Sequence, residues 1–385
     1  MKESRKKTVL NKYQRVAIIH DWLTGMRGGE VVLEALLELF PQAELFTLLH
    51  IPGSCSDLIE KRPIHTSFIQ KFPLKSKLYR HYLPFFPTAI EEFDFHGFDL
   101  VISSSHCVAK GVIVPPDVPH VSFVHSPMRY VWDMYRQYFP GKGLLQRFII
   151  PFFANYLRTW DAASAPRVDD YVSNSAFVGR RIRRFYGRQA TVVHPPCLEV
   201  GPTARDVPDP EGPQRQDFYL VLSALVPYKR IDLAVEAFNA SGRKLIIAGK
   251  GPEEKKLKAM AKQNVEFLGH VDKAGIRSLY ETSRGLLFPG VEDFGIVPVE
   301  AQAAGCPVIA LGKGGALETV INGKTGVFFE DESAKSLNSA IEQREALRFK
   351  AADFARNASR FSKDAFHRGM LLSVERAQKS VGLKV

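Results

Sequence analysis

The sequence predicts a protein of two α/β domains, each built on a parallel sheet. The chain has 385 residues, which is more than one hydrophobic core usually supports. Short apolar runs alternate with helical patterns in both halves, and this alternation is typical of parallel sheets. Between the halves, residues 199–216 are rich in proline, glycine and charge, so we expect an interdomain linker there.

The first domain, residues 1–198, contains six apolar runs that predict buried strands. Between the first two runs lies the segment GGEVVLEALLELF, in which five apolar residues fall on one helical face: Val32, Leu33, Leu36, Leu37 and Phe40. A strand, a helix and a second strand in that order indicate parallel pairing. The expected strands are 15–20, 44–50, 99–104, 120–125, 171–175 and 191–194.

The second domain, residues 217–355, repeats the same alternation of strands and helices. Helical patterns such as IDLAVEAF and PEEKKLKAMA separate its apolar runs. We expect the last segment, residues 356–385, to be a helix that crosses back to the first domain. The expected strands lie in FYLVLSAL, KLIIAG, VEFLG, GLLFPG, PVIAL and GVFFE.

The composition is that of a folded protein with an excess of positive charge. With 45% apolar and 24% charged residues, disordered, collagen-like and disulfide-scaffold classes are excluded. The four scattered cysteines and the lack of an apolar stretch behind the basic N-terminus favour a cytoplasmic location. The net charge of +11 attracts polyanions, yet no nucleic-acid module is recognisable. We therefore expect no nucleic-acid partner, and assign the charge to phosphate ligands or to an anionic membrane surface.

Two glutamates eight residues apart, Glu292 and Glu300, flank a strand-to-helix turn in GVEDFGIVPVEAQAAGCPVIA, residues 290–310. A loop at a helix N-terminus supplies backbone N–H donors and the positive end of a dipole, which suit a diphosphate. Glu300, a turn into the helix, is positioned to accept both hydroxyls of a ribose, and Glu292 to face a transferred sugar. Alternatively, both are ordinary helix-start carboxylates that the dipole favours.

The same segment carries a resemblance to a known family. EDFGIVPVE is similar to the E-x7-E signature of the family-4 retaining glycosyltransferases, which have the GT-B fold, and AGCPVIA and GGALETVINGKTGVFF also resemble that family. The resemblance implies two Rossmann-like domains facing a central cleft, with the acceptor on the first domain and the nucleotide sugar on the second. It also implies that Phe294, Gly295 and Ile296 bind the donor.

Three further donor-binding residues follow from the resemblance of other segments in the second domain. SALVPYKRID is similar to the segment that grips the donor phosphates, with Lys229 at the position of the family's lysine. The family's arginine five residues earlier is replaced by Ala224, so Arg230 is the candidate to compensate. In IIAGKGPEEKKL, Gly249 permits close backbone approach to a donor. The alternative for Lys229 and Arg230 is a solvated helix start.

The first domain adds two groups of candidate residues. Gly28 and Gly29, in IHDWLTGMRGGEVV, open a helix directly after a strand and can bring N–H groups close to a donor phosphate. His125, in VSFVHSPMRY, matches a family histidine that approaches the donor sugar. The alternatives are a tight structural turn for the glycines and a structural role for the histidine.

These residues predict glycosyl transfer with retention of configuration, with Glu292, His125 and Lys229 as the catalytic residues. HDWLTGMRGGE and HSPMRYVWD resemble bacterial mannosyltransferases of surface-polysaccharide assembly, so we expect GDP-mannose as the donor and a glycan or lipid-linked oligosaccharide as the acceptor. No D-x-D occurs, so we expect neither a metal nor another cofactor. The alternatives are a nucleotide-sugar epimerase or hydrolase on the same fold, and a basic module that binds polyanions without turnover.

One segment of the first domain predicts a location. In FIQKFPLKSKLYRHYLPFFP, residues 68–87, four cations interleave with aromatic and aliphatic side chains. Such an amphipathic element binds anionic lipid headgroups, which predicts a peripheral position on the inner face of the membrane. The alternative is that the aromatics belong to the core and the cations are solvated. The cations are Lys71, Lys75, Lys77 and Arg80.

Overall fold

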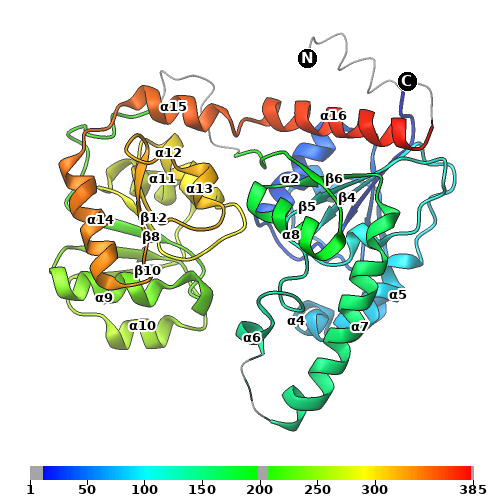
Figure 1. Cartoon of the computed structure of the whole chain (residues 1–385), viewed down its shortest axis with the longest axis horizontal. Helices are drawn as coiled ribbons and strands as arrows, with labels where there is room; N and C mark the ends of the chain where they lie inside the picture. The colour runs from blue at the N-terminus through cyan, green and yellow to red at the C-terminus, as the bar shows by residue number, and fades with distance from the viewer. Residues whose placement is uncertain (1–11, 140, 142, 198–206, 383–385) are drawn as a thin grey trace. The chain divides into compact units, whose positions relative to one another are not determined.

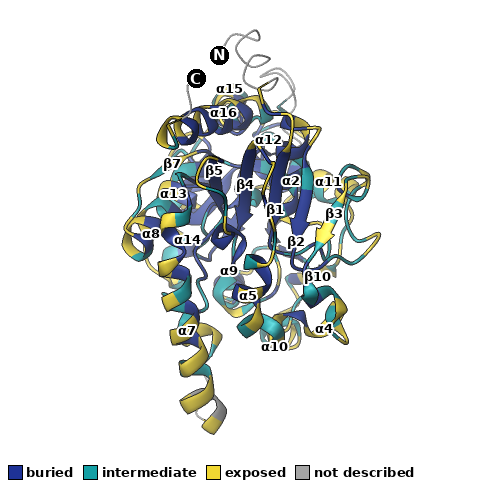
Figure 2. Cartoon of the chain, turned by 90° about the vertical axis from the view of Figure 1, so that its right-hand side faces the viewer, coloured by how far each residue is buried: buried dark blue, intermediate teal, exposed yellow. Residues whose placement is uncertain are grey.

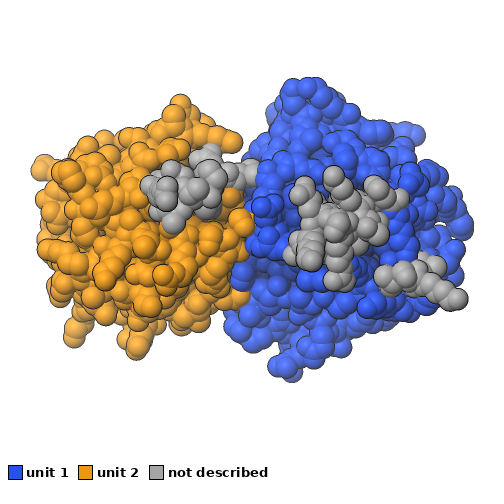
Figure 3. Space-filling model, turned by 90° about the horizontal axis from the view of Figure 1, so that it is seen from above, with its two compact units in different colours: residues 1–196, 363–385 blue, residues 197–362 orange. Residues whose placement is uncertain are grey.

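The computed structural model describes residues 12–139, 141, 143–197 and 207–382. The chain forms two compact units, coloured separately in Figure 3. The first unit comprises Met1–Pro196 and Lys363–Val385, and the second comprises Cys197–Ser362. Residues 198–206 of the expected linker lie outside the described residues.

The first unit is built on a seven-stranded parallel sheet in the order β3-β2-β1-β4-β5-β6-β7. The central strand β1 pairs with β2 through Ile18 and Leu45, and with β4 through Ile18 and Ile102. The strands are β1 (Val16–His20), β2 (Glu44–Thr47), β3 (Ile64–Thr66), β4 (Leu100–Ser105), β5 (His120–Val124), β6 (Asp170–Ser173) and β7 (Ala190–Val192).

Helices cover both faces of this sheet, because successive residues of β1 enter different cores. Ile18 packs in the core that includes side chains of α2 and α16, whereas Ile19 packs in the core that includes side chains of α5 and α7. The helices are α2 (Gly28–Leu39), α3 (Asp57–Glu60), α4 (Lys75–Leu78), α5 (Phe86–Glu91), α6 (Tyr135–Tyr138), α7 (Ile150–Ala163), α8 (Ala176–Tyr186) and α16 (Lys363–Ser380), with shorter turns η1 (Phe68–Lys71), η2 (Tyr79–Phe85), η3 (Ala109–Gly111), η4 (Leu145–Ile149) and η5 (Ala165–Arg167).

The C-terminal helix α16 packs on the first unit, although it follows the second unit in sequence (Figure 1). The Lys363 ammonium lies 2.8 Å from the Glu38 carboxylate, and His367 Nε2 lies 2.9 Å from the carbonyl oxygen of Ala35. Phe366 and Met370 are buried in the core beside α2. The last helix is therefore an integral layer of the first unit.

The second unit is built on a six-stranded parallel sheet in the order β10-β9-β8-β11-β12-β13. Its faces are covered in the same way, since Val221 packs toward α9 and α14 while Leu220 packs in the core that contains Ala301 of α12. The elements are β8 (Tyr219–Leu222), η6 (Pro227–Lys229), α9 (Ile231–Ser241), β9 (Leu245–Ala248), α10 (Glu254–Met260), β10 (Val265–Gly269), α11 (Lys273–Thr282), β11 (Leu286–Phe288), α12 (Ile296–Ala303), β12 (Val308–Leu311), α13 (Ala316–Thr319), β13 (Gly326–Phe329), α14 (Ala334–Ala346) and α15 (Ala351–Ser359).

The strand order reverses direction once in each sheet. This switch point lies between β1 and β4 in the first unit and between β8 and β11 in the second. In open α/β sheets, ligands bind at the carboxyl ends of the strands that flank such a point. The residues that follow these four strands are therefore the first place to look for a site.

The predicted two-domain α/β fold is confirmed, and the expected strands are present with shifts of a few residues at their ends. The strand β3, which has three residues, was not predicted from the sequence. The predicted amphipathic element, residues 68–87, forms the succession η1, α4, η2 and the start of α5. Tyr79 and Phe86 are buried in the core, whereas Leu74 and Phe85 are exposed. Within the described ranges, no helix combines the length and apolar character needed to cross a bilayer.

Candidate functional site

Lys229 and Glu292 meet across the switch point of the second unit. Lys229 ends the short turn η6 that follows β8, and Glu292 lies in the loop that follows β11. The Lys229 ammonium forms an ion pair with the Glu292 carboxylate. The two side chains are 14% and 23% exposed, so the pair is shielded but reachable from solvent. The structure therefore brings together two of the residues predicted to be catalytic.

Arg230 belongs to a neighbouring group of charges. Its backbone is left-handed, with φ of 53°, which directs the chain from η6 into α9. Its guanidinium Nε lies 3.3 Å from Asp232 Oδ1, and its Nη1 forms an ion pair with Glu332. Lys313, in the loop after β12, lies 3.3 Å from the same glutamate. Lys313 was not predicted from the sequence, and it adds a further cation at this edge of the sheet.

The loop before α12 is fixed by backbone contacts that require glycine. Gly295 precedes the helix and has a φ of 91°, a backbone conformation that residues other than glycine rarely adopt. The Gly315 N–H donates to the carbonyl oxygen of Glu292 at 2.8 Å, and a Cβ at Gly315 would lie 2.3 Å from the carbonyl oxygen of Phe294. The buried Phe294 and the first residue of the helix, Ile296, are thereby held in place. The first turn of such a helix presents N–H groups without intrahelical partners.

Glu300 is the fifth residue of α12 and is half-buried. The Tyr280 hydroxyl, on α11, donates to Glu300 Oε2 at 3.4 Å. Burial raises the pKa of Tyr280 well above its usual value, and the nearby Glu300 carboxylate raises it further. The tyrosine therefore keeps its proton and acts as a donor that orients Glu300.

Gly249 lets two loops of the second unit approach each other closely. Its φ is 132°, and a Cβ there would lie 1.9 Å from the carbonyl oxygen of Ser223, in the loop after β8. A Cβ at Gly251 would likewise lie 2.2 Å from the carbonyl oxygen of Leu225. The loops after β8 and β9 are thus interlocked through their backbones. Whether Gly249 also contacts a donor stays a prediction.

In the first unit, His20, Ser104 and His125 lie at the ends of the adjacent strands β1, β4 and β5. The Ser104 hydroxyl bridges the two imidazoles, 3.1 Å from His20 Nδ1 and 2.8 Å from His125 Nε2. Burial lowers the pKa of His125 well below its usual value, and the neighbouring His106 and His20 lower it further. His125 is therefore neutral near pH 7 and acts through hydrogen bonds.

Gly28 and Gly29 open α2 beside these imidazoles. A Cβ at Gly29 would lie 3.4 Å from His20 Cε1 and 4.0 Å from His125 Nε2, which is ordinary contact. The helix start already holds an acidic group, because the buried Glu30 carboxylate accepts the backbone N–H of Arg27 at 2.9 Å. Donor contact at the two glycines stays a prediction, and any phosphate there has a carboxylate as its neighbour.

Asp21 is a buried carboxylate that the sequence analysis missed. Its two oxygens accept the backbone N–H groups of residues 106–109 at 2.7 to 2.9 Å. His106 Nδ1 lies 3.1 Å from the same carboxylate, and the His106 ring lies near those of His20 and His125. Asp21 thus fixes the turn after β4 and the position of a third imidazole.

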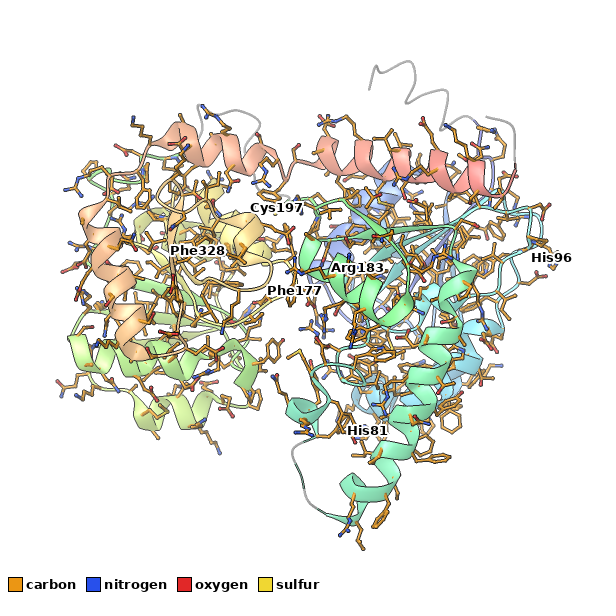
Figure 4. The ribbon with its side chains drawn as sticks, in the orientation of Figure 1. His81, His96, Phe177, Arg183, Cys197 and Phe328 are labelled. Carbon is orange, nitrogen blue, oxygen red and sulfur yellow. The ribbon has the colours of Figure 1, made fainter. Side chains whose placement is uncertain are left out.

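The segment YVSNSAFVGRRI supplies the next turn, after β6. The Ser175 hydroxyl accepts the backbone N–H of Val178 at 3.1 Å and so caps α8, the helix on which Figure 4 labels Phe177 and Arg183. The Asn174 side-chain amide donates to the carbonyl oxygen of His125 at 2.9 Å. These residues support the histidine from the next strand.

Among the described residues, no group of three or more histidine, cysteine, aspartate or glutamate side chains is arranged to hold a metal ion. The four cysteines are free thiols. Charge at the switch point of the second unit comes from lysine, arginine and glutamate side chains. Whether the reaction needs a metal stays a prediction.

Family models match most of the chain. Residues 26–197 match the model described as "Glycosyltransferase Family 4", and residues 204–361 match "Glycosyl transferases group 1". A GDP-mannose-dependent alpha-(1-6)-phosphatidylinositol monomannoside mannosyltransferase of Mycolicibacterium smegmatis is 30% identical over 196 residues, covering 43% of this chain and 50% of that protein. A glycogen synthase of Pseudomonas aeruginosa is 33% identical over 138 residues, covering 34% and 27%. The chain thus matches half or less of the length of these relatives.

Solved structures share the fold over nearly the whole chain. The lipopolysaccharide outer core galactosyltransferase WaaB superposes with a TM-score of 0.66 at 16% identity, covering 94% of this chain and 99% of that one. Sucrose-phosphate synthase from Thermosynechococcus elongatus superposes with a TM-score of 0.67 at 17% identity, covering 93% and 97%. At these identities the likeness establishes the GT-B fold alone.

Proposed function

Since this chain belongs to the family-4, group-1 glycosyltransferases, we propose that it transfers mannose from GDP-mannose to a hydroxyl group of a glycan or lipid-linked oligosaccharide, with retention of configuration. The observation that carries the proposal is the Lys229–Glu292 pair at the switch point of the second unit. The pair lies in the loops that precede α9 and α12, where a nucleotide diphosphate is commonly bound in α/β sheets.

The charges at this edge suit a diphosphate. Without donor, the ammonium of Lys229 is neutralised by Glu292, and a bound diphosphate would supply a stronger anionic partner. The Glu292 carboxylate would then be released toward the transferred sugar. Lys313 and Arg230 share Glu332, so they add positive charge at the same edge without competing for Glu292. In this proposal Glu300 accepts the ribose hydroxyls while Tyr280 orients it.

In the proposed reaction, the bond between the anomeric carbon and the diphosphate oxygen breaks, and the acceptor oxygen bonds to that carbon on the same face. The acceptor proton passes to the departing phosphate oxygen, so the balance requires no protein nucleophile. Lys229 and the helix N-terminus stabilise the charge that develops on the diphosphate. His125, neutral near pH 7, would contribute a hydrogen bond to a sugar hydroxyl.

Two observations support mannose and guanosine diphosphate. HDWLTGMRGGE and HSPMRYVWD resemble mannosyltransferases of surface-polysaccharide assembly, and two of the similar proteins are GDP-mannose-dependent by name. Glycogen synthases and a D-inositol 3-phosphate glycosyltransferase are also similar to this chain, at comparable identities. The donor must therefore be tested against other nucleotide sugars.

The donor is tested by thermal shift with GDP-mannose, GDP-glucose, UDP-glucose and UDP-galactose. A ligand that binds the native state raises the melting temperature, and we expect the largest shift with GDP-mannose. Glu300→Gln should abolish most of this shift, whereas Glu254→Gln on α10 is the matched control that should keep it. A larger shift with a uridine donor would replace the proposed donor and leave the family membership untouched.

Product analysis separates the proposed reaction from its rivals. With an acceptor present, we expect a mannosylated product and GDP in equal amounts. Equal release of GDP with and without acceptor would indicate a hydrolase, and a new sugar isomer without acceptor would indicate an epimerase. Binding of RNA without turnover of any nucleotide sugar would favour the polyanion-binding module.

The proposed reaction requires no metal, and chelation tests this directly. Lys229, Lys313 and the N-terminus of α12 provide positive charge where a divalent ion would otherwise act. We expect transfer by the purified protein to keep at least half of its rate when EDTA is present in excess over total metal. Loss of activity that magnesium or manganese restores would contradict this assignment.

A further inference from the structure

Exposed apolar side chains are concentrated at one end of α7. Between residues 144 and 156, six large apolar residues lie on the surface, and Phe152 is 70% exposed. We call this set the α7 patch. It consists of Leu144, Phe148, Ile149, Phe152, Phe153 and Tyr156.

The patch forms one continuous face of the helix. Phe148 lies in η4, which leads directly into α7, and Phe152 and Tyr156 follow it at intervals of four residues, so the three side chains lie on one side of the helical segment. Ala154 and Leu157, on another side of α7, are buried in the core of the first unit. Figure 2 shows the far end of α7 projecting below that unit with exposed residues around it. The helix therefore has one apolar face that packs in the core of the first unit and a second apolar face that is exposed to solvent.

The size of the patch argues against a second copy of the chain as its partner. At about 150–250 Å² per aromatic side chain, the exposed fractions of its four rings amount to roughly 400 Å², and Leu144 and Ile149 add a smaller aliphatic area. Patches of a few hundred Å² mark interaction sites on soluble proteins. A stable dimer usually buries about 800 Å² on each partner, and this patch is a narrow stripe on a projecting helix.

The charge around the patch selects an anionic partner. From residue 134 to residue 160 the sequence contains four basic residues and no aspartate or glutamate. Arg147 is exposed, and its guanidinium lies 5.4 Å from the centre of the Phe148 ring. Aromatic side chains that enter the acyl boundary beside cations at headgroup level are typical of surfaces that bind anionic bilayers.

A second group of exposed residues lies at the same end of the first unit. α4 and the far end of α7 both lie below the sheet in Figures 1 and 2. Around α4, Leu74 is 65% exposed and Phe85 is 52% exposed, and Lys77 and Arg80 are also on the surface. This end of the unit therefore combines apolar side chains and cations from two separate segments.

We propose that the α7 patch inserts into the surface of a bilayer rich in anionic phospholipid. This proposal rests on the proposed function, because a lipid-linked acceptor would be presented to the enzyme at the surface of a bilayer. The patch residues enter the boundary between headgroups and acyl chains, to a depth of about 5–10 Å. Arg147, together with Lys77 and Arg80 near α4, meets the phosphate groups.

The test is co-sedimentation of the full chain with vesicles of phosphatidylcholine alone and with vesicles of phosphatidylcholine mixed with phosphatidylglycerol, whose negative charge attracts basic residues. We expect binding to the anionic vesicles, weakening as salt rises, and at least tenfold weaker binding when Phe148→Ser and Phe152→Ser are combined. Leu268→Ser combined with Leu372→Ser is the matched control, because both leucines are exposed elsewhere, at 40% and 45%. The control should bind within twofold of the wild type.

Insertion is measured separately with Phe152→Trp. We expect a blue shift of the added tryptophan emission with anionic vesicles and none with neutral vesicles. Unchanged binding by the double serine variant would overturn the proposal. So would a dimer, detected by sedimentation velocity, that this variant dissociates, because the partner would then be a second copy of the chain.

These experiments test membrane binding by the α7 patch and the proposed function separately. The double serine variant lies outside the donor-binding residues, so it should keep the full thermal shift with GDP-mannose. If wild-type protein binds vesicles but gives no shift with any nucleotide sugar, the proposed function is wrong and the patch stands. If the shift is present but vesicle binding is absent, the patch assignment is wrong.

Discussion

The two switch points share one topology but differ in chemistry. In the second unit, the loops after β8 and β11 bring together Lys229 and Glu292, with Lys313 nearby. In the first unit, the ends of β1, β4 and β5 bring together two imidazoles and the Ser104 hydroxyl. The fold fixes where the strand ends meet, whereas the residues there decide which ligand groups they suit.

This difference divides the expected roles of the two units. A diphosphate carries negative charge, which the lysines of the second unit can neutralise. The first unit offers the neutral imidazole of His125, and the buried carboxylates of Asp21 and Glu30 lie at the ends of neighbouring elements. Neutral hydrogen-bonding groups suit sugar hydroxyls rather than phosphates. We therefore expect binding of the donor phosphates to depend on residues of the second unit.

Glycine substitution gives the largest expected difference between the units. Gly249→Ala places a Cβ 1.9 Å from a backbone carbonyl oxygen at a φ of 132°, so the loops after β8 and β9 must separate. We expect the second unit to lose roughly 3–5 kcal/mol of unfolding free energy. Gly29→Ala, in the first unit, adds a Cβ with its nearest contact at 3.4 Å inside a helix, so its effect should stay within about 1 kcal/mol.

Hydrogen exchange on peptides from each unit checks this prediction during urea titration. Faster exchange in β8 and β9 of the Gly249→Ala variant, with an unchanged first unit, is the expected result. Equal exchange in wild type and variant would mean that the loops accommodate a side chain, and the interlocked arrangement would be wrong.

Acid should destabilise the first unit selectively. Buried His120 lies with Nδ1 3.0 Å from the carbonyl oxygen of Arg167 and Nε2 2.9 Å from the Ser103 hydroxyl, which suits a neutral ring. Burial lowers the pKa of His120 to about 4 from 6.5. The unfolded chain binds this proton near pH 6.5 but the folded chain only near pH 4. The unfolding free energy should therefore fall as the pH drops through this window, by about 3 kcal/mol.

Tryptophan fluorescence measures this loss, because Trp22, Trp132 and Trp160 all lie in the first unit. His120→Gln should reduce the dependence on pH between 6.5 and 4. The second unit has a single histidine, the exposed His270, and serves as the internal comparison by hydrogen exchange. The same pH dependence in the variant would assign the effect to other groups.

Removing the bridge between the imidazoles should have the smallest effect on stability. Ser104→Ala deletes the hydroxyl that contacts both His20 and His125, and should lower the unfolding free energy by about 1 kcal/mol. Ser122→Ala is the matched control, since Ser122 Oγ is buried in the adjacent strand without a hydrogen-bond partner in the described structure. Nitrogen NMR of His125 should report a change of tautomer or pKa only in the Ser104 variant. Identical His125 spectra in both variants would show that the Ser104 hydroxyl does not set the tautomer or the pKa of His125.

Much of the second unit could be predicted from local sequence. Its strands are short apolar runs between glycines and prolines, and Lys229 and Glu292 each lie in the segment that joins such a run to the next helix. Because carboxyl ends of parallel strands meet at one edge, the position after a strand already indicates proximity. The role of Gly249 in packing against Ser223 was not predictable, since it depends on how two loops approach one another.

The cluster of the first unit depends on contacts that no local pattern contains. Asp21 accepts N–H groups from residues 106–109, which are distant in sequence, and Ser104 joins strands that the chain order does not make neighbours. β3 was missed because Ile64–Thr66 is too short to show a periodicity. The sequence alone does not indicate which apolar residues of α7 are left exposed.

The central claim is that Lys229 of the second unit, rather than the imidazoles of the first, binds the donor diphosphate. Titration calorimetry with GDP-mannose tests it in wild type, Lys229→Met, His125→Asn and the control Lys258→Met, which removes the lysine of an exposed pair with Glu254. Loss of a charged hydrogen bond predicts about ten- to hundredfold weaker binding for Lys229→Met. We expect His125→Asn and Lys258→Met to bind within about threefold of the wild type (about 0.7 kcal/mol). Wild-type affinity in a folded Lys229→Met variant, or loss of binding in His125→Asn alone, would contradict the claim.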